Sequence, residues 1–127
     1  ILIDAHSMPH EAILNASTGF HTSQLVLGDR YGASCSPDIV NNLAMLISKN
    51  GLHASRNIPF SGAYIVQKYG RPELNRHAIQ LEIDRSMYMD ERKIQKLEKF
   101  YKLKNQLLNI LRDFSKTHTS VTSIAAE

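Results

Sequence analysis

The chain has 127 residues, 43% of them hydrophobic and 21% charged, a size and composition typical of one globular domain with a single core. Its net charge is +3, but the basic residues between positions 93 and 116 are interleaved with acidic ones, as on a solvated helix face. This pattern argues against a nucleic-acid-binding protein, and no apolar run is long enough to cross a bilayer. A single cysteine, Cys35, excludes an intramolecular disulfide and fits a reducing compartment, so we expect a cytoplasmic protein.

The first part of the chain predicts two strands separated by a loop. Residues 1–3 are apolar and lead into His6 before Pro9 stops the run, which predicts a buried strand that ends in a histidine. Residues 10–23 are rich in Ser, Thr, Asn and Gly and predict a loop with at most a short helical turn. Residues 24–28 form a second short apolar run and predict another buried strand.

A helix is predicted to begin at Pro37. Ser36 is a favoured N-cap residue, and proline suits the first helical position. Gly51 is typical of a residue that follows a helix end. Residues 52–55 then predict a short strand, and residues 56–73 a long loop interrupted by glycine and proline.

The last part of the chain predicts a strand and a long helix. Residues 78–83 alternate in polarity as a strand does, and a helix is expected over residues 91–115. An apolar stripe of that helix is expected to pack on the sheet: Ile94, Leu97, Tyr101, Leu107, Leu108 and Leu111. Strands alternating with helices predict an α/β layer architecture.

Several polar residues fall at or near the ends of predicted strands, where α/β proteins collect functional groups: His6, Arg56, Asn57 and Glu82. Glu82 interrupts an apolar strand, and a buried carboxylate is unfavourable unless something compensates it. Two explanations stay open for Glu82, an ion pair with Arg85 or another arginine and a general base facing a metal-bound water. Two also stay open for His6, a hydrogen-bonded core histidine and a zinc ligand.

Four arginines lie in predicted turns or at strand ends rather than on a helix face: Arg30, Arg56, Arg71 and Arg85. Guanidinium groups bind carboxylates in a bidentate manner, so a small dianionic ligand would suit two of them. Each arginine could instead close a local turn or pair with Asp29, Glu73 or Asp84, and we favour this explanation for Arg30 and Arg85. Tyr64 and Tyr69 are expected in the core, and Cys35 is expected to be a packed thiol.

Four segments, LIDAHSMP, LGDRYGASC, SRNIPFSGAYIVQKYGRPE and HAIQLEIDRSMYMDE, closely resemble in that order the C-terminal half of the N-formylglutamate amidohydrolases. The resemblance implies an α/β fold that is part of a zinc-exopeptidase-like (phosphorylase/hydrolase-like) mixed sheet, with flanking helices and a long C-terminal helix. Residues 1–116 would then form the C-terminal part of one catalytic domain, and residues 117–127 a polar tail.

The resemblance also implies site residues. The histidine of DAHS, His6, matches the third zinc ligand, and the glutamate of LEIDR, Glu82, matches the carboxylate that activates water. Four residues are implied to bind the substrate: Arg56, Asn57, Tyr64 and Arg71. The other two zinc ligands of the family are expected upstream of Ile1, so we expect this chain to be either a fragment or a truncated relative.

The implied reaction is the zinc-dependent hydrolysis of the formyl amide of N-formyl-L-glutamate to glutamate and formate, in histidine degradation. Zinc would polarise the carbonyl, Glu82 would carry a proton from water to the leaving amine, and two arginines would hold the carboxylates of this small substrate. Two alternatives stay open, a related amidohydrolase of the aspartoacylase or succinylglutamate desuccinylase type and a non-catalytic protein that binds an acidic ligand or a partner chain. An uncovered sheet edge would also favour a homo-oligomer.

Overall fold

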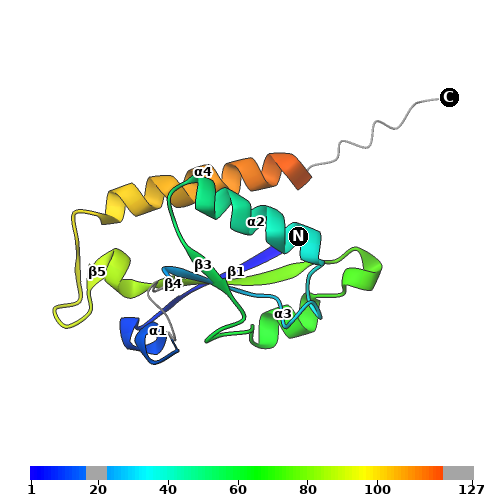
Figure 1. The fold of residues 1–127 in the computed structure, drawn as a ribbon, viewed down its shortest axis with the longest axis horizontal. Helices are drawn as coiled ribbons and strands as arrows, with labels where there is room; N and C mark the ends of the chain where they lie inside the picture. Colours follow the sequence, from blue (N-terminus) through cyan, green and yellow to red (C-terminus); the bar gives the residue numbers. More distant parts are fainter. Residues whose placement is uncertain (17–22, 119–127) are drawn as a thin grey trace.

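A four-stranded mixed sheet in the order β1-β4-β2-β3 forms the centre of the fold (Figure 1). The computed structural model describes residues 1–16 and 23–118. Strand β1 (Leu2–Met8) runs parallel to β4 (Ala78–Asp84), β2 (Leu25–Gly28) runs antiparallel to β4, and β3 (Ala54–Arg56) runs parallel to β2. The mixed α/β architecture expected from the sequence is therefore present.

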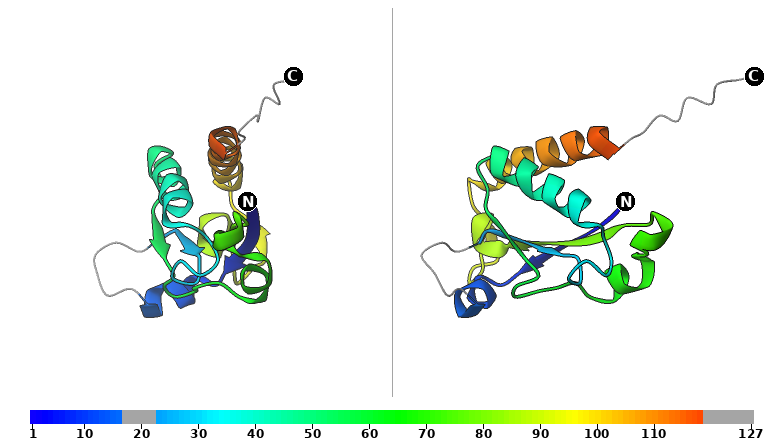
Figure 2. Two further views of the ribbon diagram at one scale, coloured as in Figure 1. Left: turned by 90° about the vertical axis from the view of Figure 1, so that its right-hand side faces the viewer. Right: turned by 45° about the vertical axis from the view of Figure 1, so that its right-hand side comes forward.

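Helices lie on both sides of this sheet. Figures 1 and 2 show α2 (Pro37–Lys49) and α4 (Phe100–His118) on one face and α1 (His10–Ala16) and α3 (Tyr64–Tyr69) on the other. The two helices of the first face cover the main core, whereas α1 and α3 lie toward opposite ends of the second face. None of the helices in the described part of the chain is both long and apolar enough to cross a membrane.

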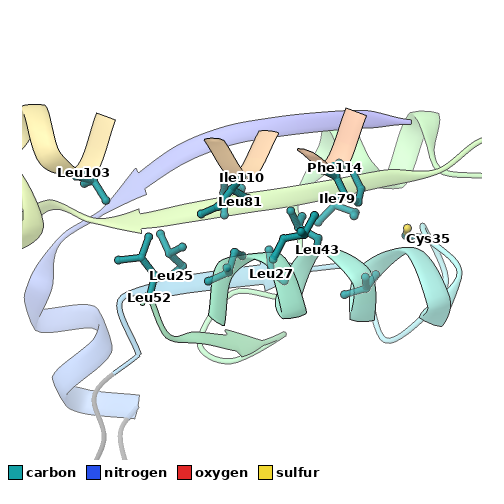
Figure 3. Close-up of a cluster of buried hydrophobic side chains, with 13 residues drawn as sticks. Leu25, Leu27, Cys35, Leu43, Leu52, Ile79, Leu81, Leu103, Ile110 and Phe114 are labelled. Carbon is teal, nitrogen blue, oxygen red and sulfur yellow. The ribbon is translucent and has the colours of Figure 1, made fainter. Parts of the chain in front are cut away.

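The main core fills the space between the sheet and the helices α2 and α4 (Figure 3). Because alternate residues of a strand point to the same face, β2 presents two apolar side chains to these helices and β4 presents three. The fully or almost fully buried members of this core include Leu25, Leu27, Ile79 and Leu81 from the strands and Leu43, Ile47, Ile110 and Phe114 from the helices.

The start of α2 follows the sequence prediction. Ser36 has an extended backbone at the N-cap, Pro37 is the first helical residue, and Asp38 places a carboxylate in the first turn, where it is favourable to the helix dipole. Gly51, just past the helix, has φ +74°, a left-handed conformation that favours glycine. The predicted helix start and end are confirmed.

His77 holds this helix start through its neutral ring. Its Nδ1 accepts the backbone N–H of Ser36 at 3.2 Å, and its Nε2 lies 3.1 Å from Oδ1 of Asn75. Burial lowers the pKa of His77, and the positive amino terminus and His118 lower it further. A proton on Nδ1 would remove the acceptor of the Ser36 N–H, so the charged ring does not suit this position.

We expect the stability of the protein to fall as the pH drops below the ordinary histidine pKa of about 6.5. Because the pKa of His77 is lowered in the folded state, the unfolded state binds more protons in this window, and the free energy of unfolding rises with pH there. His77→Gln should lose that part of the pH dependence, and about 1 kcal/mol of stability at pH 7.5 if its amide cannot replace the hydrogen bond. Urea unfolding at pH 5 and pH 7.5 measures both, and equal pH dependence in the two proteins would contradict this assignment.

Cys35 is a packed thiol, as predicted. It is fully buried in the main core, and burial together with the negative charge of Asp29 raises its pKa to about 12.

Since the thiolate is the reactive form, iodoacetamide at pH 8 should label folded Cys35 roughly 1000-fold more slowly than the unfolded chain. Mass spectrometry with and without urea measures this ratio, and rapid labelling of the folded protein would show that the site opens.

The long C-terminal helix begins later than the sequence predicts. Residues 91–99 were expected to be helical, but β5 (Met89–Asp90) pairs with β6 (Gln95–Lys96) in a short hairpin. Oδ1 of Asp90 accepts the backbone N–H groups of residues 92 and 93, both at 3.0 Å, a side-chain-to-backbone pattern that competes with helix formation. Ile94 in the turn has φ +54° and is 81% exposed, so its predicted packing on the sheet is wrong.

The buried stripe of α4 also differs from the predicted stripe. Tyr101, Leu108 and Leu111 are exposed, whereas Leu103 and Ile110 are buried with Phe114. The apolar side chains of α4 form a stripe about half of its circumference wide. Packing against the sheet and α2 decides which part of that stripe is buried. The helix also runs through residues 117 and 118 of the predicted tail, while residues 119–127 of that tail lie outside the described residues.

Two short helices occupy segments predicted as loops. Helix α1 begins directly after Pro9, and its Ile13 is buried with Met8 and Val26 on the second face of the sheet. Helix α3 lies inside the predicted loop of residues 56–73. Helix α1 has seven residues and α3 has six. At such lengths sequence periodicity is a weak signal for a helix, and packing on the sheet decides whether the helix forms.

Candidate functional site

One face of the sheet carries a row of polar side chains from the parallel strands β1 and β4. In their register, Asp4 lies beside Gln80 and His6 beside Glu82, and Asp84 follows at the end of β4. Alternate residues share a face, so these side chains lie on the side of α1 and α3, away from the main core. His6 and Glu82, far apart in the sequence, are therefore brought together near the carboxyl ends of two parallel strands, where ligands of α/β proteins bind.

Glu82 is a buried carboxylate with one oxygen unused. The residue is 7% exposed, and its Oε1 accepts a hydrogen bond of 2.8 Å from Nε2 of Gln80. Gln80 in turn accepts the N–H of Ala63 at 2.7 Å through Oε1. The second oxygen of Glu82, Oε2, is buried and accepts no hydrogen bond from any described residue. Such an orphaned acceptor is rare in folded proteins, and it marks a position where a water, a proton or a ligand completes the site.

The alternative explanation of Glu82 as the partner of Arg85 is wrong. Arg85 instead points to β1, where its Nε and Nη2 donate to the hydroxyl and the carbonyl oxygen of Ser7, both at 3.3 Å. Within the described part of the chain no cation forms an ion pair with Glu82. Its burial is therefore not explained by a structural salt bridge.

His6 lies at the surface of this face and not in the core. Its side chain is 47% exposed, and its Nε2 lies 2.9 Å from Oδ1 of Asp4, which excludes the core-histidine explanation. The other oxygen of Asp4, Oδ2, is buried and accepts no hydrogen bond from a described residue. Because Nε2 faces Asp4, Nδ1 is the ring nitrogen left for a further partner. Metal-binding histidines commonly have this arrangement, with a carboxylate on one nitrogen and the metal on the other.

The described residues do not complete a metal site by themselves. Among residues 1–16 and 23–118, no three His, Cys, Asp or Glu side chains are grouped so that they could hold a metal ion. A catalytic zinc has three protein ligands. A metal ion held by His6 would therefore need further ligands from outside the described residues.

Two of the residues predicted to bind substrate, Arg56 and Asn57, surround a buried carboxylate. Asp29 is fully buried, and Nη2 of Arg56 forms an ion pair with its Oδ2. Nδ2 of Asn57 donates to Oδ1 of Asp29 at 2.6 Å, and Oδ1 of Asn57 accepts the backbone N–H of Asp29 at 3.0 Å. The ion pair raises the pKa of Arg56. Nη1 of Arg56 reaches Asn41 of α2 at 3.4 Å, so these contacts lie on the other side of the sheet from Glu82.

The other two predicted substrate-binding residues, Tyr64 and Arg71, lie around α3. Tyr64 is 65% exposed, so its expected place in the core is wrong, as it is for the exposed Tyr69. Nη1 of Arg71 donates to the carbonyl oxygens of Gln67 and Gly70 at 2.8 and 2.5 Å. Arg71 lies near the amino end of β4, because its backbone pairs with residue 76, just before that strand.

Sequence reasoning missed the residues that orient His6 and Glu82. Asp4 precedes His6 by two positions and Gln80 precedes Glu82 by two, so each lies on the same face as the residue it contacts. The sequence contains the pattern that could have identified them, because the polar residues alternate with apolar ones along two predicted strands. This pattern indicates a shared site only once the two strands are known to be parallel neighbours.

Comparisons with known proteins agree on one family. The sequence model of the family described as "N-formylglutamate amidohydrolase" matches residues 1–89. Two relatives are named N-formylglutamate deformylase: one from Pseudomonas aeruginosa is 41% identical and one from Pseudomonas putida 38% identical, each over 66 residues, or 51% of this chain and 25% of the relative. The crystal structure of N-formylglutamate amidohydrolase from Ralstonia eutropha JMP134 has a TM-score of 0.80 and 32% identity, covering 90% of this chain and 42% of that one. The chain thus spans a quarter of the curated relatives and under half of the solved structure.

Proposed function

Because the chain belongs to the N-formylglutamate amidohydrolase family, we propose that the natural protein carrying it hydrolyses the formyl amide of N-formyl-L-glutamate to glutamate and formate. The observation that carries this proposal is Glu82, a buried carboxylate with an unused oxygen beside His6. A general base needs a free lone pair in a site that excludes most water. Glu82 has both, and Gln80 fixes its orientation.

We further propose that His6 is one ligand of a catalytic zinc ion. The support is the pair of His6 with Asp4, which leaves Nδ1 for the metal, and the buried carboxylate oxygens on the same face. A bound zinc ion would polarise the formyl carbonyl and activate the attacking water. The residues of this chain then have separate tasks: Asp4 orients the ring of His6, and Oε2 of Glu82 accepts a proton from water and passes it to the leaving nitrogen.

The substrate carboxylates are proposed to bind near the amino end of β4, where Tyr64 and Arg71 lie beside α3. Among the described residues, Arg71 uses only Nη1 in contacts with the backbone, so its Nε and Nη2 remain for a bidentate carboxylate. Arg56 and Asn57 support the neighbouring loop through Asp29. A substrate carboxylate at Arg56 would have to share this guanidinium with Asp29.

The test is formate release by the natural protein that carries these residues. We expect hydrolysis of N-formyl-L-glutamate and much weaker hydrolysis of N-formyl-L-glutamine, because the latter lacks one carboxylate for an arginine to bind. Chelation should remove the activity and Zn²⁺ should restore it, and His6→Ala should lower the zinc content per chain. If no formate is released at any zinc concentration, the proposed activity is wrong. Activity that survives complete metal removal would overturn the zinc proposal alone.

A further inference from the structure

A second histidine–carboxylate pair lies at the carboxyl ends of β1 and β4. Nδ1 of His10, the first residue of α1, lies 2.8 Å from Oδ2 of Asp84, the last residue of β4. Oγ of Ser86 is also 3.2 Å from this nitrogen, and the backbone N–H of Ser86 donates to Oδ1 of Asp84 at 2.9 Å. The backbone N–H of His10 donates to Glu91 at 2.9 Å. The imidazole is thus held at Nδ1 by Asp84 and Ser86, and the backbone of His10 is held by Glu91.

The ring of His10 is partly exposed, and one of its two nitrogens has no polar partner among the described residues. Asp84 is buried, whereas the side chain of His10 is 40% exposed, and its Nε2 contacts no polar group among the described residues. A buried carboxylate that fixes Nδ1 and leaves Nε2 accessible is typical of a histidine placed to face a ligand. The proposed chemistry of Glu82 and His6 does not use this pair.

His10 lies on the same face as Glu82 and beyond it along the strand. Glu82 and Asp84 are alternate residues of β4, so their side chains share a face and stand about 7 Å apart. The residues proposed to bind the substrate carboxylates, Tyr64 and Arg71, lie at the opposite, amino end of β4, where Gln80 contacts Ala63. A substrate held there with its amide at Glu82 directs its acyl group toward His10.

We propose that His10, positioned by Asp84, forms the acyl-side wall of the site and restricts the acyl group of the substrate to one the size of formyl. This inference rests on the proposed function and adds the residue that determines acyl specificity. A formyl group ends in a hydrogen atom, so it offers no side chain to recognise. Discrimination against larger acyl groups must therefore come from a rigid wall. The hold of Asp84 and Ser86 on Nδ1, together with the hold of Glu91 on the backbone of His10, supplies that rigidity.

The experiment compares kcat/KM for N-formyl-L-glutamate and N-acetyl-L-glutamate in the natural protein and in His10→Ala. We expect the acetyl-to-formyl ratio of kcat/KM to rise at least about tenfold in His10→Ala, since a methyl group accepted or rejected by a pocket changes this ratio by about 10- to 200-fold. Glu11→Ala, a change of the adjacent exposed residue in the same helix, should leave the ratio unchanged. Thermal unfolding of each variant checks that the fold is kept.

A second variant tests the role of the carboxylate. Asp84→Asn keeps the size of the side chain but weakens its hold on the ring, so it should raise the acetyl-to-formyl ratio in the same direction and by less than His10→Ala. A ratio that stays within twofold of the wild-type value in folded His10→Ala overturns the inference while leaving the proposed function intact. A wild-type protein that releases no formate overturns both. KM for N-formyl-L-glutamate should change little, because His10 does not face the substrate carboxylates.

Discussion

Glu82→Gln is expected to lower kcat/KM for N-formyl-L-glutamate by about 10²- to 10⁴-fold, the contribution of a well-placed general base. The amide is the same size as the carboxylate, and its oxygen can still accept the hydrogen bond from Gln80. Because no described residue donates to the buried Oε2 of Glu82, removal of the charge should leave the free energy of unfolding unchanged or raise it by about 1 kcal/mol. Activity and stability are therefore expected to separate in this variant. Formate release and urea unfolding measure the two effects.

The matched control is Glu73→Gln, the same chemical change at an exposed residue of the short helical turn Pro72–Leu74. It should alter neither rate nor stability. If the Glu82→Gln protein retains more than a tenth of the wild-type activity, Glu82 is not the general base. If the Glu82→Gln variant does not fold under conditions in which the wild type does, the carboxylate instead stabilises the fold through a partner outside the described residues.

The parts of the fold that the sequence predicts well are those governed by local rules. The apolar runs of β2 and β4 are buried on both faces, and the residues around Ser36 and Gly51 set the ends of α2 through backbone conformation. The segment around Ile94 was misassigned because its alternating lysines and acids have the period of a helix. The Asp90 side chain and the pairing of β5 with β6 prevent a helix there, and that competition is not visible in periodicity.

The site shows the same division between local and non-local information. Glu82 and His6 were recognisable as polar residues at strand ends, and their resemblance to a family assigned roles to them. Their adjacency depends on β1 and β4 being parallel neighbours in a specific register, which no local pattern determines. Asp29 was one of three possible partners for the arginines, but its pairing with Arg56 in particular depends on β2 and β3 lying side by side. The roles of the substrate-binding residues stay predictions.

Asp29→Ala is expected to be the most destabilising single change among the polar residues of this fold. The side chain is fully buried and both its oxygens are used, one by Arg56 and one by Asn57. Its loss would leave Asn57, with φ +62°, and the end of β3 without their common partner. Removing one member of a buried charged network typically lowers stability by about 3–5 kcal/mol. Because the Arg56 side chain is 36% exposed and would be rehydrated in part, we expect a loss of roughly 2–4 kcal/mol.

Asp113→Ala provides the comparison, since Asp113 pairs with Lys116 at 3.5 Å on the surface of α4, with side chains 52% and 70% exposed. An exposed pair of this kind contributes at most about 0.5 kcal/mol, so the two aspartates should differ severalfold in urea unfolding. The double variant Asp29→Ala with Arg56→Ala should lose less stability than the sum of the single changes, because the second change removes the charge that the first leaves unpaired. Equal losses for Asp29→Ala and Asp113→Ala would show that the buried network is not what holds the end of β3.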